Sequence, residues 1–284
     1  MITAAKIHVL IDNSANPDEP RLHAEHGLSL LIDVQLKDES ARILLDTGPL
    51  PHLLLQNAKY LNIDFSTVNA ILLSHGHYDH VGGLLTILPH ITSSTPIIAH
   101  PDTFLPKFAY RPYLKSIGAP FSPMALQTRN AMLLQTADPV PVLDGVKTTG
   151  EIERKTPYEK VTGYYTLQAN HLIPDYLHDD QSLILHLKKK GLIVICGCAH
   201  SGLINTITHA KHIMKTDTVY AVIGGFHLKN ATPQRIDATV DALQQLNVKQ
   251  IAPCHCTGSK AIQKFTSSFK QQCHPLRVGD VLTF

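Results

Sequence analysis

A short stretch of the chain, SHGHYDH, brings together four side chains that can bind metals: His75, His77, Asp79 and His80. Residues 68–74, which lead into it, form an apolar run that predicts a buried strand. In a tight turn, residues 75 and 77 would point to one side, and residues 79 and 80 would reach a second point nearby. Neutral imidazole and carboxylate suit Zn²⁺, Fe or Mn. One loop could therefore supply ligands to two metals, which would activate a hydroxide at neutral pH.

Three later histidines, His200, His227 and His255, also follow apolar segments, and each has small neighbours such as glycine or cysteine. Loops at strand ends are where folds place functional groups, and small residues let the backbone approach closely. We therefore predict that these three complete the site. The chain has 18 histidines, and those outside this set of six are interpreted mainly as structural or surface groups.

The predicted elements place these loops at strand ends. The first third of the chain is dominated by strands, predicted at residues 6–12, 27–36 and 41–45, with a helix at 50–61. The last third alternates strands with helices: strands at 181–187, 192–196, 219–223, 250–252 and 281–284, and helices at 200–214, 232–246 and 258–269. Two sheets packed together with helices outside would accommodate both patterns.

Residues 100–170 interrupt this pattern with many prolines and tyrosines. We interpret them as one long, partly irregular insertion within a single domain that spans residues 1–284. Long loops in compact enzymes usually form lids or substrate walls. A poorly structured decoration is the alternative.

The composition disfavours several classes of protein. Lys and Arg number 25 against 23 Asp and Glu, and a net charge of +2 gives little reason to bind nucleic acid. No apolar stretch reaches the length of a membrane span, and the N-terminus does not resemble a signal peptide. Five cysteines, an odd number, argue against a disulfide framework. We therefore expect a cytoplasmic protein with no membrane or nucleic-acid partner.

Three cysteines flank candidate ligands: Cys198 precedes His200, and Cys254 and Cys256 lie on either side of His255. Thiolate is a good zinc ligand. Neighbouring residues at a strand end point to opposite sides, so Cys254 and Cys256 should not share the metal of His255. We interpret the cysteines as buried packing groups, with Cys198 as the candidate if one of them binds metal.

Two motifs resemble those of the metallo-β-lactamase superfamily. SHGHYDHVGG at residues 74–83 is similar to its main metal motif, and ILLDTG at residues 43–48 is similar to its earlier strand-and-aspartate motif. The resemblance spans nearly the whole chain. It implies an α+β fold, the αββα four-layer sandwich, with two mixed β-sheets and helices outside. It also implies a dinuclear site at one edge of the sheets, with two Zn²⁺ per chain as the first choice and Fe or Mn as other metals.

The same resemblance assigns ligands residue by residue. The first metal would be held by His75, His77 and His200, and the second by Asp79, His80 and His255. Asp46 would orient one of these ligands and the loop by hydrogen bonding. The alternative interpretation of Asp46 is an ordinary aspartate in a turn.

The chain departs from the commoner pattern at the ligand that bridges the two metals. Most dinuclear members have an aspartate between the last two histidines, where this chain has His227. Asp217 precedes the strand in question, and Asp237 and Asp241 lie in the following helix. Imidazole bridges metals poorly, so His227 either binds one metal or stays unbound as a proton donor or substrate contact. One metal per chain is therefore an alternative.

A narrower set of motifs resembles one branch of the superfamily. The segments AEHGLS (24–29), TGEI (149–152), DDQS (179–182), GCAHSG (197–202), GGFHL (224–228) and PCHCTG (253–258) are similar to archaeal dihydropterin–ribofuranosylaminobenzene 5'-phosphate synthases. Their reaction joins a pterin to an aryl amine and displaces pyrophosphate. Many bacterial members of the branch are described only as metal-dependent hydrolases.

Together these features predict a metal-dependent hydrolase or transferase that acts on a small, phosphate-bearing anionic molecule. A metal-activated hydroxide or a metal-stabilised leaving group would drive the reaction, with Asp79 as a ligand and His227 or His26 as proton donor. One alternative is a pterin-type synthase that transfers a dihydropterin-methyl group with loss of pyrophosphate. Another is a non-catalytic metal or ligand sensor on the same fold. The sequence does not fix the oligomeric state, and a homodimer is one option.

Side chains of residues 100–170 could contact such a substrate. Arg111, Lys115 or Arg154 could neutralise a phosphate, and tyrosines such as Tyr164 could stack on a flat heterocycle. Solvated surface charge and core packing are the alternatives for these groups.

Overall fold

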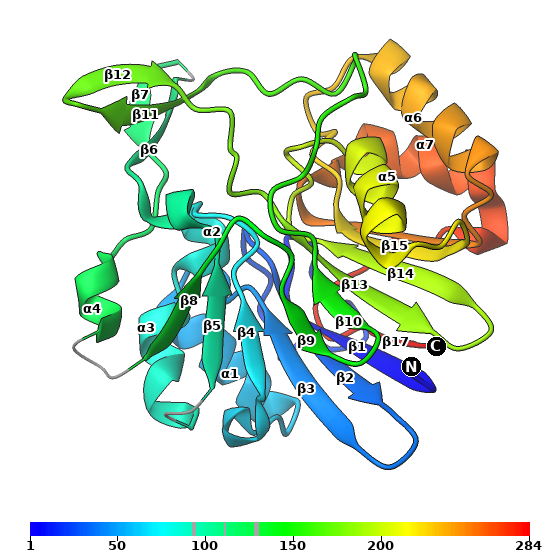
Figure 1. Ribbon diagram of the computed structural model, residues 1–284, viewed down its shortest axis with the longest axis horizontal. Coiled ribbons are helices and arrows are strands. Elements are labelled where there is room, and N and C mark those ends of the chain that lie inside the picture. Colours follow the sequence, from blue (N-terminus) through cyan, green and yellow to red (C-terminus); the bar gives the residue numbers. More distant parts are fainter. Residues whose placement is uncertain (93–94, 111, 128–130) are drawn as a thin grey trace.

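Apolar strands build two mixed β-sheets that pack face to face (Figure 1). The structure, a computed structural model, describes residues 1–92, 95–110, 112–127 and 131–284. Within those ranges, the first sheet has seven strands in the order β17-β1-β2-β3-β4-β5-β8, and the second has six in the order β16-β15-β14-β13-β10-β9. The first sheet comprises β1 (Ala4–Ile11), β2 (Ser29–Gln35), β3 (Ser40–Leu45), β4 (Ala70–Leu72), β5 (Pro96–Ala99), β8 (Met132–Gln135) and β17 (Val281–Thr283). The second comprises β9 (Pro141–Leu143), β10 (Val146–Thr148), β13 (Ser182–Leu187), β14 (Gly191–Cys196), β15 (Val219–Gly225) and β16 (Gln250–Cys254).

Alternation along the strands fills a core on each face of each sheet. In β2, Leu30 and Ile32 enter the core between the sheets, whereas Leu31 faces the helices outside. The first sheet is covered by α1 (Pro51–Tyr60) and α3 (Leu84–Ile87), and the second by α5 (Leu203–Met214), α6 (Pro233–Gln245) and α7 (Ser259–Phe269) (Figure 1). These four layers are the predicted αββα sandwich. No helix in the described parts of the chain is long and apolar enough to span a membrane.

The strands that lead into the predicted site run parallel to their neighbours. β3 pairs in parallel with β4, and β15 pairs in parallel with both β14 and β16. The carboxyl ends of parallel strands lie at one edge of a sheet. The loops that carry the predicted ligands, after β4, β14, β15 and β16, therefore open at one edge of the sandwich.

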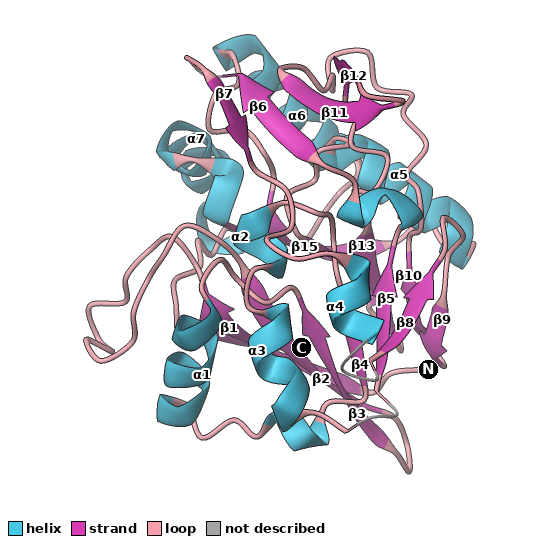
Figure 2. Cartoon of the chain, turned by 90° about the vertical axis from the view of Figure 1, so that its left-hand side faces the viewer, coloured by secondary structure: helices cyan, strands magenta, loops and turns pink. Residues whose placement is uncertain are grey.

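Residues 100–170 do not form the single insertion that the sequence predicted. β8 extends the first sheet, and β9 and β10 belong to the second. Four other strands of the described chain form a separate sheet, in the order β12-β11-β6-β7, which we call the accessory sheet; it stands apart from the sandwich (Figures 1 and 2). Its strands are β6 (Lys107–Tyr110), β7 (Leu114–Ser116), β11 (Tyr164–Gln168) and β12 (His171–Pro174). Strands this short carry too little periodicity to be found from sequence.

Candidate metal centre

The loop after β4 is held in one shape by contacts to its backbone. The N–H of Gly76, between the first two histidines, donates a hydrogen bond to Asp179 Oδ2 at 2.7 Å. A Cβ atom at Gly76 would lie 1.8 Å from the carbonyl oxygen of Thr103, so glycine is required there. Asp179 is paired with the buried Lys107, whose Nζ lies 2.9 Å from Asp179 Oδ1 and 3.1 Å from Asp175 Oδ2. Because Lys107 begins β6, the accessory sheet anchors this loop.

Three histidines, His75, His77 and His200, form the group that we call the first triad. One ring nitrogen of each lies within 4.8 Å of the other two, and His75 Nε2 is 2.9 Å from His77 Nδ1. All three side chains are buried, and His200 Nε2 has no hydrogen-bond partner among the described residues. A buried polar atom without a partner is costly unless something else binds it. Three imidazoles this close together fit one metal ion.

Asp79, His80 and His255 form the second triad. The first two lie in the short helix α2 (Tyr78–Val81), and His255 directly follows β16. His255 Nε2 is 3.1 Å from His80 Nε2 and 3.5 Å from Asp79 Oδ2, and the remaining separation, between Asp79 Oδ2 and His80 Nε2, is 3.8 Å. Two imidazoles and one carboxylate are a donor set for divalent metals. The structure thus brings the six residues together in the two predicted groups of three, and their role as ligands stays a prediction.

Carboxylate and amide groups direct the rings of the second triad. His80 Nδ1 donates to Asp46 Oδ2 at 2.6 Å, and His255 Nδ1 donates to Asn13 Oδ1 at 2.8 Å. Each ring thereby turns its Nε2 toward the centre. Asp46 also accepts the backbone N–H and the hydroxyl of Ser74, at 2.7 and 2.6 Å, and so joins the ends of β3 and β4. Asp46 therefore occupies the orienting position that the resemblance implied.

His26 and His227, the two predicted proton donors, lie beside the triads. His26 is exposed, and its Nε2 is 3.3 Å from Asp79 Oδ2. The ring of His227 lies 4.1 Å from that of His200, centroid to centroid, and its Nε2 is 3.1 Å from the Tyr164 hydroxyl. His227 Nδ1 is buried and has no hydrogen-bond partner among the described residues. The position of His227 is compatible with both of its predicted roles.

Burial keeps most of these imidazoles neutral, with one exception. The pKa of His80 is raised to about 9, because the carboxylates of Asp46 and Asp79 outweigh the burial that acts to lower it. Burial, helped by charge on neighbouring histidines, lowers the pKa of four others well below the ordinary value: His75, His77, His200 and His255. A neutral imidazole has the lone pair that a metal needs, so metal binding would have to displace a proton from His80.

A cavity of about 260 Å³ opens beside both triads. Its walls include His26 and Asp79 from the sandwich, Ala109 and Tyr164 from the accessory sheet, and the exposed Lys229. Ligand pockets usually measure about 300–1,000 Å³, so this one suits a small molecule or part of one. A larger cavity of about 390 Å³ lies along β1, β2 and β3, and no predicted site residue lines it.

Sequence reasoning missed several residues that shape the centre. Asn13 follows the apolar strand β1 just as the predicted ligands follow theirs, and that signal could have identified it. Lys107 carries no such signal, because its pairing with Asp179 depends on the accessory sheet. Lys229 lies two residues after His227, close enough in sequence to have been considered with it.

Of the arginines and lysine expected near phosphate, the two that lie in the described residues are not free in the site. Arg154 donates to the carbonyl oxygen of Leu177 at 2.7 Å and to Ser201 Oγ at 3.2 Å. Lys115 is exposed on β7, with its Nζ 4.6 Å from the ring centroid of Tyr113. Arg111 lies outside the described residues.

The structure corrects one argument about the cysteines. β16 ends at Cys254 and His255 has φ 48°, so strand alternation does not continue through this segment. As a result, Cys256 Sγ lies within 4.8 Å of a ring nitrogen of His255. All five cysteines are buried and none forms a disulfide in the described structure.

Comparison with known proteins places the chain in a family. The profile of the metallo-β-lactamase superfamily matches residues 24–226, and the chain belongs to that superfamily. A relative from Methanocaldococcus jannaschii, 7,8-dihydropterin-6-methyl-4-(beta-D-ribofuranosyl)-aminobenzene-5'-phosphate synthase, is 36% identical over 98% of this chain and 96% of its own length. An uncharacterized protein of the same organism is 32% identical over 92% of this chain and 93% of its own.

Solved structures share the fold. A metal-dependent hydrolase of the β-lactamase superfamily matches with a TM-score of 0.80 and 27% identity over 98% of each chain. A diphosphatase of the PhnP family matches with a TM-score of 0.53 and 14% identity, over 100% of this chain and 98% of that one, which shows the fold alone. The chain is therefore a metallo-β-lactamase superfamily enzyme whose buried histidine and cysteine clusters are compatible with metal binding.

Proposed function

We propose that the protein is a metal-dependent synthase that transfers a dihydropterin-methyl group to the nitrogen of an aryl amine, with loss of pyrophosphate. The observation that carries this proposal is the similarity to the Methanocaldococcus jannaschii synthase, which covers 98% of this chain and 96% of that one at 36% identity. That relative is named for a product in which a dihydropterin-methyl group is joined to a ribofuranosyl aminobenzene phosphate. The proposed substrates follow from that product.

The proposed reaction is a substitution at carbon. A bond forms between the amine nitrogen and the methyl carbon of the pterin, and the bond from that carbon to the pyrophosphate oxygen breaks. The electron pair of the broken bond leaves with pyrophosphate, and the amine gives up one proton. Divalent metals at the triads would supply positive charge that favours binding and departure of pyrophosphate. The small net charge of the chain, +2, is therefore no argument against anionic substrates.

Residues around the cavity support the proposal. Lys229 lines it and can bind a phosphate oxygen through its ammonium group. Tyr164 lines it as well and offers an aromatic surface to a flat heterocycle. His26, next to Asp79, lies where it can protonate the departing pyrophosphate, and His227 lies where it can accept the amine proton.

The experiment is a coupled product assay on the metal-loaded, full-length protein. The dihydropterin-methyl pyrophosphate and the aminobenzene ribofuranosyl phosphate are supplied together, and both the joined product and pyrophosphate are measured. We expect the two to appear in equal amounts and to depend on metal. The His75→Ala, His77→Ala double variant should lose this activity. Absence of the joined product with the metal-loaded, unmodified protein would overturn the proposal.

A second candidate, a hydrolase of small phosphate-bearing molecules, is favoured by the similarity to the solved metal-dependent hydrolase, with a TM-score of 0.80 and 27% identity. The same assay separates the two. Pyrophosphate released at an equal rate with and without the amine, and no joined product, would favour the hydrolase. Tight binding of substrates without turnover would instead indicate a sensor on the same fold.

A further inference from the structure

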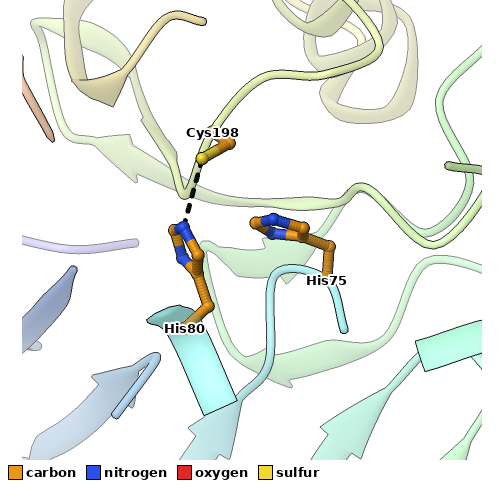
Figure 3. A group of neighbouring side chains, drawn as sticks. All are labelled: His75, His80 and Cys198. Atoms are coloured by element: carbon orange, nitrogen blue, oxygen red, sulfur yellow. Dashed lines mark hydrogen bonds between the residues drawn. The ribbon is translucent and has the colours of Figure 1, made fainter. Parts of the chain in front are cut away.

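Cys198 lies between the two triads. It follows β14, its side chain is buried, and its Sγ is 3.1 Å from His80 Nε2. Figure 3 shows the sulfur directed at this ring, with the His75 ring alongside. Sγ also lies within 4.8 Å of a ring nitrogen in each of His75, His200 and His255. One sulfur atom is therefore close to donors from both triads.

The backbone around Cys198 has the features needed for this position. A Cβ atom at Gly197 would lie 2.0 Å from Ser74 Oγ, so glycine lets the end of β14 contact the end of β4. Ala199 has φ 50°, an uncommon conformation for a residue with a side chain. This turn lets Cys198 and His200 face the centre from one strand end. Such conformations cluster at functional sites, where surrounding structure maintains them.

The described centre has no aspartate in the place of the bridging ligand of the commoner pattern. Asp217, Asp237 and Asp241 are all exposed, whereas the residues of both triads are buried. His227 occupies the strand-end position, but the two nitrogens of one imidazole point in different directions and bridge closely spaced metals poorly. A thiolate sulfur has several lone pairs on one atom and can contact two metals.

We propose that Cys198 is a metal ligand whose thiolate joins the two triads. Donor atoms about 2.0–2.3 Å from a tetrahedral zinc ion lie about 3.3–3.8 Å from one another, close to the observed 3.1 Å between Cys198 Sγ and His80 Nε2. An independent observation agrees: Cys198, His200 and His227 form a cluster of donors within 4.8 Å, and both histidines carry a buried nitrogen that has no partner among the described residues. The inference rests on the metal centre of the proposed enzyme and not on its substrate.

Cys256 is the rival sulfur, and its contacts differ. Its Sγ accepts the backbone N–H of His227 at 3.3 Å, and its thiol donates to the carbonyl oxygen of Cys198 at 3.6 Å. Cys256 Sγ also lies within 4.8 Å of Cys198 Sγ and of a ring nitrogen of His255, but Cys198 is the cysteine whose Sγ lies 3.1 Å from an imidazole nitrogen. The contrast assigns the ligand role to Cys198.

The first test is spectroscopic and does not use activity. The full-length protein is stripped of metal, loaded with Co²⁺, and its near-ultraviolet absorption is recorded for the sulfur-to-cobalt charge-transfer band. The same measurement is made on Cys198→Ala, on Cys256→Ala, and on Cys273→Ala as a matched control, since Cys273 is a buried cysteine whose Sγ lies 3.8 Å from Thr266 Oγ1, at the end of α7. Circular dichroism of each variant checks the fold.

We expect the band in the unmodified protein and in the Cys256→Ala and Cys273→Ala variants. The band should be absent from Cys198→Ala, and Co²⁺ should bind this variant at least about tenfold more weakly. Loss of a group that only hydrogen-bonds a ligand weakens metal binding about 10–100-fold, and loss of the ligand itself should weaken it no less. A band that persists in Cys198→Ala, or that is lost only in Cys256→Ala, overturns the proposal.

A second test needs no variant, in case Cys198→Ala fails to fold. X-ray absorption of the zinc-loaded, unmodified protein should show a sulfur scatterer at about 2.3 Å from zinc. A shell of nitrogen and oxygen alone overturns the inference. Synthase activity with such a shell would refute the role of Cys198 and leave the proposed function standing. A sulfur-bound metal without synthase activity would support the role of Cys198 and overturn the proposed function.

Discussion

The two triads lie side by side but are held by different parts of the molecule. The first triad depends on packing: Tyr164 of the accessory sheet lies 5.3 Å from the rings of both His77 and His200, centroid to centroid. Its loop is anchored by Asp179 and Lys107, and Lys107 also belongs to the accessory sheet. The first triad is therefore formed where the sandwich meets a separate, small sheet.

The second triad depends on directed hydrogen bonds within the sandwich. Asp46, at the end of β3, orients His80, and Asn13, after β1, orients His255. It also contains a carboxylate, Asp79, whereas the first triad has only neutral imidazoles. The side chains of the first triad would leave the charge of a divalent metal intact, whereas Asp79 would partly neutralise it in the second; a Cys198 thiolate shared by both metals would not remove this difference. The metal of the first triad, next to Tyr164 of the accessory sheet, would therefore be the stronger electrophile.

The largest expected effect comes from breaking the anchor of the first triad. Lys107→Met leaves two nearly buried carboxylates, Asp175 and Asp179, without their cation. Removing one partner of a buried ion pair costs about 3–5 kcal/mol, so the free energy of unfolding should fall by about that much. Urea denaturation of the metal-free protein measures it. Lys115→Met, at an exposed lysine of the same sheet, should change the free energy of unfolding by less than about 0.5 kcal/mol. Equal effects of the two variants would contradict the role of Lys107 as the anchor of the first triad.

The next effect should fall mainly on the second triad, because Asp46 contacts His80 directly and reaches His75 of the first triad only through the Ser74 hydroxyl. Asp46→Asn keeps the shape of the side chain but removes the charge that orients His80, and loss of such a group weakens metal binding about 10–100-fold. Calorimetric titration with Zn²⁺ should show that one site is weakened much more than the other. Asp33→Asn, which removes a carboxylate paired with Arg42 far along β2, is the control. Equal weakening of both sites would show that the triads do not form independently.

Histidines with a lowered pKa and His80, whose pKa is raised, should shape opposite limbs of the pH dependence of metal-free stability; the lowered group comprises the whole first triad and His255. The unfolded chain protonates histidines near 6.5, whereas His75 and His77 resist protonation in the folded state, so the free energy of unfolding falls as pH drops below that value. His80 contributes stability that is complete below 6.5 and is lost as pH rises through about 9. The unfolding temperature should therefore be highest near 6.5 and fall by about 2 °C or more on each side.

Thermal unfolding followed by circular dichroism in chelator tests these two limbs. The His75→Ala, His77→Ala double variant should make the acid limb shallower, with His200 and His255 responsible for the slope that remains, and Asp46→Asn should flatten the alkaline limb. A double variant whose acid limb matches that of the unmodified protein would mean that other groups control it.

The smallest effect is expected at the contact between the accessory sheet and the site. Tyr164→Phe keeps the ring but removes the hydroxyl that contacts His227 Nε2. A hydrogen bond contributes about 0.5–1.5 kcal/mol, so kcat/KM in the synthase assay should fall about two- to tenfold while metal content is unchanged. Tyr165→Phe, on the opposite face of β11, is the matched control. Loss of metal in Tyr164→Phe would show that the hydroxyl supports the first triad itself.

Much of the fold was predictable because its signals are local. The long apolar strands, the helices of the last third and the N-cap of α6, where Thr232 Oγ1 accepts the N–H of Arg235, all appear close to where the sequence placed them. The four layers followed from those elements and from the resemblance to the superfamily. The accessory sheet did not, because strands of three to five residues are stabilised by partners elsewhere in the chain and not by their own periodicity.

The candidate metal centre shows the same difference between features with local sequence signals and features that depend on distant parts of the chain. The sequence by itself determined which side chains could bind metal, because ligand types and strand-end loops are readable within a few residues, as in the stretch from His75 to His80. Only the tertiary structure decided what surrounds them: Asn13 reaches His255 across 242 positions of the chain, and Lys107 reaches Asp179 across 72. It also distinguished Cys198, whose Sγ lies 3.1 Å from His80 Nε2, from Cys256, whose Sγ accepts the backbone N–H of His227 at 3.3 Å. These contacts depend on how the two sheets of the sandwich and the accessory sheet pack together, and no local pattern of residues predicts that packing.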